Sequence, residues 1–104
     1  MKLPNAGRAE VTIRKLRDYC LNPTHPEGRH KARRFKAALG LTAADAQELR
    51  EALLAAVTAG NATRGTQDQF GVRYVVDFEM RRAGSRASIR SAWIIGTDES
   101  RPRF

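Results

Sequence analysis

The chain has 104 residues, enough for one small domain that buries a modest hydrophobic core without the support of a metal or a disulfide. Its 19 lysines and arginines outnumber its 11 aspartates and glutamates, so the net charge of +8 favours a polyanion such as nucleic acid as the partner, with a merely solubilising surface as the alternative. The single cysteine excludes an internal disulfide, and no apolar run approaches the ~18 residues that a membrane span needs.

A first helix is predicted over residues 12–21. Its apolar residues Ile13, Leu16 and Cys20 recur at helical spacing, while charged residues occupy the opposite side, so we expect one buried stripe. The helix should end at Asn22, because a residue that precedes proline is pushed out of helical geometry.

A second helix is predicted over residues 26–39. Pro26 suits the first helical position, where a missing amide hydrogen costs nothing, and Gly40 is a natural stop. Thr24 or His25 would then cap the helix. Most of the cations in this segment fall on its solvated side.

A third helix is predicted over residues 42–58, beginning near Thr42. It is rich in alanine and net acidic, which is typical of scaffold rather than of a nucleic-acid surface.

Beyond Gly60 the periodicity changes from helical to alternating, which is typical of strands. Strands are predicted over residues 71–80 and 86–96 with a hairpin turn between them. Residues 61–69 are polar and fit either a loop or a weak edge strand, and residues 101–104 fit either a further edge strand or a tail. The alternation places five apolar residues on one face of the first strand, namely Val72, Tyr74, Val76, Phe78 and Met80. The predicted fold class is therefore α+β, with N-terminal helices packed on a small antiparallel sheet in one domain that spans the chain.

Residues 22–36 hold both histidines and five of the cations, and they pass from a turn into the basic second helix. His25 fits two roles: a cap or turn-packing residue, or a general acid or base for metal-free RNA cleavage, in which the ribose 2′-hydroxyl attacks phosphorus. Lys31 shares the apolar stripe of the helix, so its amine either snorkels to water or faces a cleft beside the sheet and neutralises a phosphate. Gly28 permits close approach of the backbone, and the helix N-terminus adds amide donors.

The other candidate residues lie on the predicted sheet. Ser91 interrupts an apolar face beside Trp93, which indicates either room for a packed helix or a group that positions substrate. Arg73 and Arg90 project from the opposite face. Trp93 is expected to be a core residue in the first place, with stacking on a nucleic-acid base as a secondary role. The scattered His, Cys, Asp and Glu residues match no metal spacing, and the chain has no glycine-rich phosphate loop.

Several parts of the sequence resemble a widespread bacterial domain family of unassigned function. The central part is Leu16-x-x-Tyr19-x-Leu21-Asn22-Pro23-x-His25-Pro26-x-Gly28-x-x-Lys31-Ala32-x-x-Phe35-x-x-Ala38-Leu39-Gly40, which contains the signature LNPxHPxGxxKAxxFxxALG of that family. Others are Gly71-x-x-Tyr74-x-Val76-Asp77 and Arg90-Ser91-Ala92-Trp93-Ile94. The family is similar in layout to the BECR superfamily of metal-independent ribonuclease toxins (barnase, EndoU, colicin nucleases and RelE-like toxins), in which N-terminal helices pack on an antiparallel sheet.

This resemblance implies a toxin-like endoribonuclease that needs no metal or cofactor and cleaves RNA by internal transesterification. The catalytic residues would be His25, Lys31, Arg90 and Ser91, and the substrate contacts would come from Gly28, Arg29, His30, Arg34, Arg73 and Trp93. RNA would be the substrate, and an antitoxin or immunity protein the protein partner. A cytoplasmic location, or delivery as a toxin module, goes with the single cysteine and with an N-terminus that lacks a signal-peptide hydrophobic region.

Two other functions fit the same residues. One is a non-catalytic basic module that binds nucleic acid or protein and uses the second helix for phosphate contacts only. The other is a structural protein in which the signature merely builds the turn between two helices.

Overall fold

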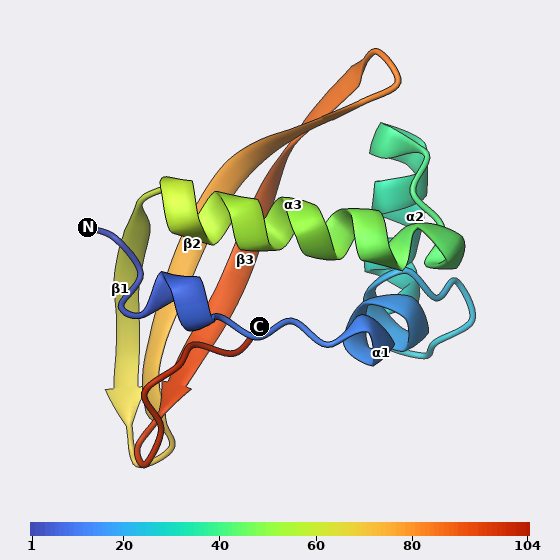
Figure 1. Cartoon of the computed structure of the whole chain (residues 1–104). Helices are drawn as coiled ribbons and strands as arrows, with labels where there is room; N and C mark the ends of the chain where they lie inside the picture. Colours follow the sequence, from blue (N-terminus) through green and yellow to red (C-terminus); the bar gives the residue numbers. More distant parts are fainter. The chain divides into compact units, whose positions relative to one another are not determined.

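A computed structural model describes the whole chain, residues 1–104 (Figure 1). Helices precede strands along the chain, and the predicted α+β class is confirmed. The helices are α1 (Ile13–Lys15), which continues as a π-helical turn over Leu16–Cys20, then α2 (Arg29–Leu39) and α3 (Ala46–Ala59). The strands β1 (Ala62–Asp68), β2 (Gly71–Arg82) and β3 (Ser85–Gly96) form one antiparallel sheet in that order.

The start of α2 differs from its predicted position. The helix begins at Arg29 rather than at Pro26, because residues 26–28 form a turn that the His25 ring closes. Gly40 ends the helix as predicted, with a φ of 67° that favours glycine.

The polar stretch 61–69 contains the strand β1, so the edge strand was the correct one of the two alternatives. Ala62 pairs with Val76 and Asp68 with Gly71, with an irregularity in register between Arg64 and Gln67. All of β1 except Ala62 is exposed, which explains why the strand lacks an apolar face in the sequence.

The chain divides into two compact units. The first comprises residues 1–11, 53–78 and 88–104, and the second comprises residues 12–52 and 79–87. The buried side chains of the first unit include Leu3, Val57, Tyr74, Val76 and Trp93. Those of the second unit include Leu16, Leu21, Leu39, Leu49 and Met80. The burial of Tyr74, Val76 and Met80 confirms the apolar face predicted for the strand β2, on which Val72 and Phe78 are half-buried.

Within the first unit, the C-terminal residues extend the pairing of the strand β3. Arg103 bridges to Ile94 in antiparallel and to Glu10 in parallel orientation. Two backbone hydrogen bonds of 2.9 Å join Arg103 and Ile94. Residues 101–104 therefore lie beside the sheet as a short additional edge rather than as a tail.

Within the second unit, Arg82 ties the tip of the β2–β3 hairpin to the helices. Its Nε lies 2.8 Å from Glu48 Oε2, and its Nη2 lies 3.2 Å from Asp45 Oδ1. Its Nη1 donates to the carbonyl oxygens of Leu39 (3.0 Å) and Gly40 (3.2 Å). One guanidinium thus supplies donors to carbonyls at the end of α2, which have no partner within the helix, and to carboxylates at the start of α3.

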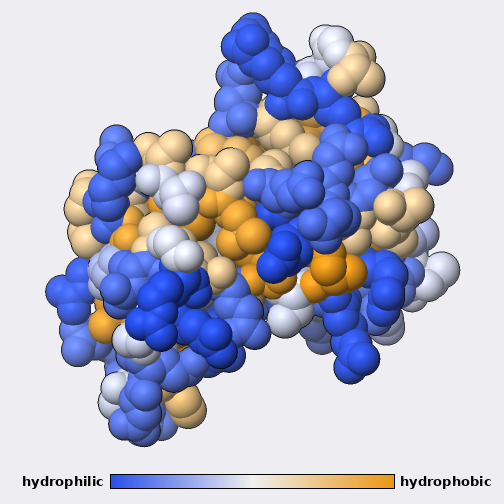
Figure 2. All heavy atoms as spheres, in the orientation of Figure 1, coloured by the Kyte–Doolittle hydropathy of each residue, from blue (hydrophilic) through white to orange (hydrophobic).

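Hydrophilic residues cover much of the face shown in Figure 2, and hydrophobic residues gather over α3. Exposed residues of that helix include Ala55 and Ala59, in keeping with its alanine-rich sequence. None of the helices combines the length and the hydropathy that crossing a bilayer requires.

Candidate nucleic-acid interface

The turn between α1 and α2 is built by side chains that replace missing backbone partners. His25 Nδ1 accepts hydrogen bonds from the backbone amides of Glu27 and Gly28, each at 3.0 Å. Asn22 Oδ1 accepts from the backbone amide of Thr24 at 3.0 Å and from its hydroxyl at 2.8 Å. Because Nδ1 of His25 is an acceptor, the hydrogen of the neutral ring is assigned to Nε2.

Gly28 is buried at the point where this turn crosses the preceding helix. A Cβ at this position would lie 2.0 Å from the carbonyl oxygen of Tyr19. The backbone angles of Gly28 (φ −78°, ψ −15°) are open to any residue, so the requirement for glycine is one of space. The backbone of Gly28 therefore makes its close contact with the backbone of Tyr19 rather than with a ligand.

Tyr19 is the centre of a cluster of three side chains in the second unit. The His25 ring meets the Tyr19 ring edge-on, with centroids 4.6 Å apart. Lys31 Nζ lies 5.8 Å from the Tyr19 centroid, within the range of a cation–π contact. Lys31 is exposed, so its amine reaches water as well as the ring. The structure thus brings His25 and Lys31 together on Tyr19, which was not among the site residues expected from the sequence.

The signal that pointed to Tyr19 is its place in the pattern that carries the family resemblance, where it stands beside His25, Gly28 and Lys31. Periodicity alone missed it, because a half-buried tyrosine at helical spacing looks like any other core residue.

The outer face of α2 is a basic surface without acidic neighbours on the helix. The helix contains five cations and no acidic residue. Its exposed basic residues besides Lys31 are Arg29, His30, Arg33, Arg34 and Lys36. None of them takes part in a side-chain hydrogen bond or an ion pair in the structure. We call this set of five residues the α2 basic surface.

Arginines of the strands β2 and β3 and of the C-terminal segment differ from those of the α2 basic surface, because nearly all of them are paired with carboxylates. The ion-paired residues are Arg73, Arg81, Arg82, Arg90, Arg101 and Arg103. Among the arginines from residue 73 onward, only Arg86 has no carboxylate partner. A phosphate that approaches most of these arginines must compete with a carboxylate already in place.

The predicted catalytic residue Arg90 belongs to this paired group. Its Nε and Nη2 lie 2.9 Å and 3.1 Å from the two carboxylate oxygens of Asp77 on the neighbouring strand. The hydrogen bond between the two side chains lowers the pKa of Asp77 and raises that of Arg90. The predicted substrate contact Arg73 is likewise paired, with Asp68 Oδ2 at 2.7 Å from its Nη1. Both arginines lie in the first unit.

Ser91 and Trp93 form a buried polar bridge in the first unit, each with 1% of its surface exposed. The Ser91 hydroxyl donates to the carbonyl oxygen of Val76 at 2.7 Å and accepts from Trp93 Nε1 at 2.9 Å. The Trp93 ring also meets the Phe104 ring edge-on, with centroids 5.4 Å apart. The hydroxyl hydrogen is already used, and the indole is enclosed. Both side chains are thus engaged in the core of the first unit, which for Trp93 is the role expected first; a catalytic role for Ser91 and base stacking by Trp93 stay predictions.

The expected site residues are thus distributed over both units. His25, Gly28, Lys31 and the α2 basic surface belong to the second unit, whereas Arg73, Arg90, Ser91 and Trp93 belong to the first. No group of three or more His, Cys, Asp or Glu side chains is arranged to hold a metal ion.

Cys20 is buried beside this region and does not add a reactive group to it. Burial raises the pKa of its thiol, and the charges of Lys31 and Lys15 oppose that rise. A buried thiol with a raised pKa is a poor nucleophile and a poor metal ligand.

A family model described as "Domain of unknown function (DUF6883)" matches residues 2–104. No curated protein and no solved structure matches the chain.

Proposed function

The chain belongs to DUF6883, a domain family of unknown function, and we propose that it is a nucleic-acid-binding module whose α2 basic surface contacts the phosphates of RNA. The observation that carries the proposal is the contrast in pairing between cations. The α2 basic surface is exposed and unpaired, whereas the arginines of the strands β2 and β3, except Arg86, are paired with carboxylates.

Unpaired surface cations suit a phosphate backbone for a simple energetic reason. A free guanidinium or ammonium binds phosphate without first giving up a carboxylate, and each contact releases a counterion from the nucleic acid. Binding of this kind follows the backbone rather than the base sequence, and it weakens steeply with salt. Arg29, Arg33 and Arg34 in addition present planar forks that match phosphate oxygens.

The test is a salt titration of RNA binding. The affinity of the chain for a fluorescent single-stranded RNA is measured by anisotropy over a range of salt concentrations. Neutralising two contacts in the double variant Arg33→Gln/Arg34→Gln should weaken binding and reduce the slope of log K against log salt by about 1.4, at ~0.7 per contact.

The matched control is Arg8→Gln/Arg64→Gln, which removes the same charge from two exposed arginines outside α2 that have no carboxylate partner. It should leave the salt slope nearly unchanged. Equal losses in the two double variants would mean that net charge rather than α2 determines binding, and absence of binding by the parent chain would overturn the proposal.

A second candidate function is RNA cleavage by internal transesterification, and the cluster of His25 and Lys31 on Tyr19 favours it. In this reaction Nε2–H of His25 and the amine of Lys31 would hydrogen-bond the phosphate and stabilise its developing charge. A role for His25 as general acid needs a second ring proton on Nδ1, where two backbone amides already donate. The geometry therefore supports binding more directly than proton transfer.

Incubation of the chain with total RNA in the presence of a chelator separates the two candidates. His25→Asn keeps a side-chain acceptor for the turn but removes the imidazole, and Lys31→Met keeps the stem but removes the charge. Loss of cleavage in both variants with RNA binding retained would establish catalysis. Cleavage at the parent rate in both would exclude these residues. By the same resemblance, an antitoxin or immunity protein would be the partner of a cleaving chain.

A further inference from the structure

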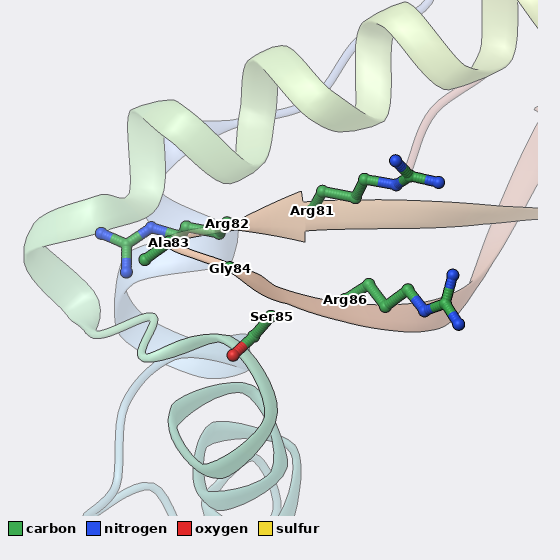
Figure 3. A pocket seen from close by; sticks show the side chains of 6 residues that line it. All are labelled: Arg81, Arg82, Ala83, Gly84, Ser85 and Arg86. Atoms are coloured by element: carbon green, nitrogen blue, oxygen red, sulfur yellow. The ribbon is translucent and has the colours of Figure 1, made fainter.

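The tip of the β2–β3 hairpin carries two arginines on one side. Ala83 and Gly84 form its two-residue turn, with φ of 51° and 83°. Arg82 and Ser85 flank this turn, so the next residues along the two strands, Arg81 and Arg86, lie opposite each other. Figure 3 shows their side chains extending in the same direction along the hairpin, while Arg82 points the opposite way. Like charges directly opposite each other on neighbouring strands destabilise a hairpin.

This repulsion is only partly compensated by the chain. Glu79 Oε1 lies 2.7 Å from Arg81 Nε, and it is the carboxylate that pairs with this side of the tip. Arg86 is exposed and has no hydrogen bond or ion pair of its side chain. Arg81 thus has one carboxylate partner, with which a phosphate would compete, and Arg86 has none.

The hairpin tip also contains a hollow, and contacts of Arg82 hold the tip in place. Residues 81–86 line a hollow of about 440 Å³ that is open to solvent (Figure 3). Behind it, Arg82 fixes the turn through the carboxylates of Asp45 and Glu48 and the carbonyls at the end of α2. The exposed Ser85 also lines the hollow, and Figure 3 shows its side chain pointing away from those of Arg81 and Arg86. A preorganised frame of this kind reduces the entropy lost on binding.

We propose that the hairpin tip is a phosphate-binding site in which Arg81 and Arg86 hold the oxygens of one phosphate group between two planar guanidinium forks. A bound dianion relieves the repulsion between the two arginines and adds charge-assisted hydrogen bonds. The ligand is a phosphate group, supplied either by inorganic phosphate or by the terminal phosphate of an RNA. The site lies outside the α2 basic surface and does not depend on the function proposed for it.

The experiment is a titration of the ¹⁵N-labelled chain with inorganic phosphate at constant ionic strength, followed at the backbone amides of Gly84 and Ser85. Both amides should shift saturably. Arg86→Gln should weaken the apparent affinity roughly tenfold, the amount expected for loss of a charge-assisted contact. The phosphate affinity of Arg86→Lys should lie between those of the parent and Arg86→Gln, because lysine keeps the charge but lacks the planar guanidinium fork.

Arg64→Gln is the matched control, since it removes one exposed arginine from another strand; it should bind phosphate like the parent. A dispersed spectrum of Arg86→Gln shows that this variant folds. Absence of saturable shifts at Gly84 and Ser85, or parental affinity in Arg86→Gln, would overturn the proposal.

The source of the phosphate is distinguished in the Arg33→Gln/Arg34→Gln background, where contacts from α2 are weakened. Short RNAs of one sequence with a 5′-phosphate or a 5′-hydroxyl are compared at the same two amides. A response to the phosphorylated RNA alone identifies a terminal phosphate. A response to inorganic phosphate but to neither RNA identifies the free anion. Either result supports the site even if RNA binding by α2 fails its own test.

Discussion

The His25 imidazole meets the Tyr19 ring edge-on, with centroids 4.6 Å apart and planes inclined at 62°. Nδ1 of the same imidazole accepts hydrogen bonds from two backbone amides, so the ring and one of its nitrogens are both engaged within the protein. The histidine of the signature is thus a structural residue first. Its Nε2–H is the group left for a ligand.

Replacing His25 should separate its structural role from any chemical one. His25→Ala removes the acceptor of two amides and should lower the free energy of unfolding by about 1–2 kcal/mol, as for the loss of a helix cap. His25→Asn should recover much of this loss, because the asparagine oxygen can take the place of Nδ1. Urea denaturation of the three proteins measures the difference, and equal stabilities of the Ala and Asn variants would contradict the capping role.

Gly28→Ala should be among the more damaging single substitutions in the second unit. The added methyl would lie 2.0 Å from the carbonyl oxygen of Tyr19, so the turn and the preceding helix must move apart. Overpacking of this kind costs about 3 kcal/mol. Gly7→Ala is the control, because a Cβ there meets nothing within 4 Å. Thermal unfolding of both variants tests the prediction, and similar melting temperatures would argue against the steric requirement at Gly28.

The elements that depend on local spacing could be predicted from the sequence. Alternating apolar residues located the strand β2, and the pair Asn22-Pro23 located the end of the first helix. The strand β1 could not be assigned in the same way, since its residues are polar and exposed and its conformation comes from pairing with β2. The start of α2 was misplaced because the His25 side chain, rather than Pro26, determines where the turn ends.

The candidate site was harder to predict, because pairing between charged groups is a property of the fold. The sequence shows nineteen cations but not which of them have partners. Arg82 finds its carboxylates and carbonyls more than thirty residues away along the chain. Ser91 likewise shows in the sequence as a polar residue on an apolar face, and only the fold shows that its hydroxyl is used by Val76 and Trp93.

The stability of the chain should fall in acid partly through Asp45. Its carboxylate accepts from the backbone amide of Thr42 at 2.9 Å and from the Thr42 hydroxyl at 3.1 Å. These hydrogen bonds, the backbone one first, lower the pKa of Asp45, and the charge of Arg82 acts in the same direction. Since the folded pKa lies below the unfolded value, the carboxylate stabilises the fold above about pH 4, and this contribution is lost as the pH falls through the folded pKa.

Asp45→Asn should therefore be less stable than the parent at neutral pH, and the difference should shrink below about pH 4. Urea denaturation at a series of pH values measures both curves. Asp98→Asn is the control, because Asp98 is exposed and takes part in no ion pair. A difference between parent and Asp45→Asn that stays constant down to pH 2 would contradict the assigned role of the ionised carboxylate.

Arg82 should contribute more to stability than its neighbour Arg81, although both are arginines of one strand. The Arg82 side chain is 25% exposed and pairs with two carboxylates, whereas that of Arg81 is 75% exposed and pairs with one. Arg82→Met keeps the apolar stem but leaves two carbonyls and two carboxylates without their shared donor, which should cost about 2–3 kcal/mol. Arg81→Met should change stability by less than about 0.5 kcal/mol, because exposed ion pairs contribute little.

Denaturant unfolding of the two methionine variants measures this difference, and Arg82→Lys refines it. Lysine keeps the charge but cannot reach both carbonyls and both carboxylates with one planar fork, so its stability should fall between the parent and Arg82→Met. Amide exchange at Gly40, Gly84 and Ser85 should quicken with the loss of the guanidinium, since it joins the end of α2 to the hairpin turn. Equal effects of Arg82→Met and Arg81→Met would mean that the hairpin tip is held by its backbone alone, and the frame on which the proposed phosphate site depends would lose its anchor.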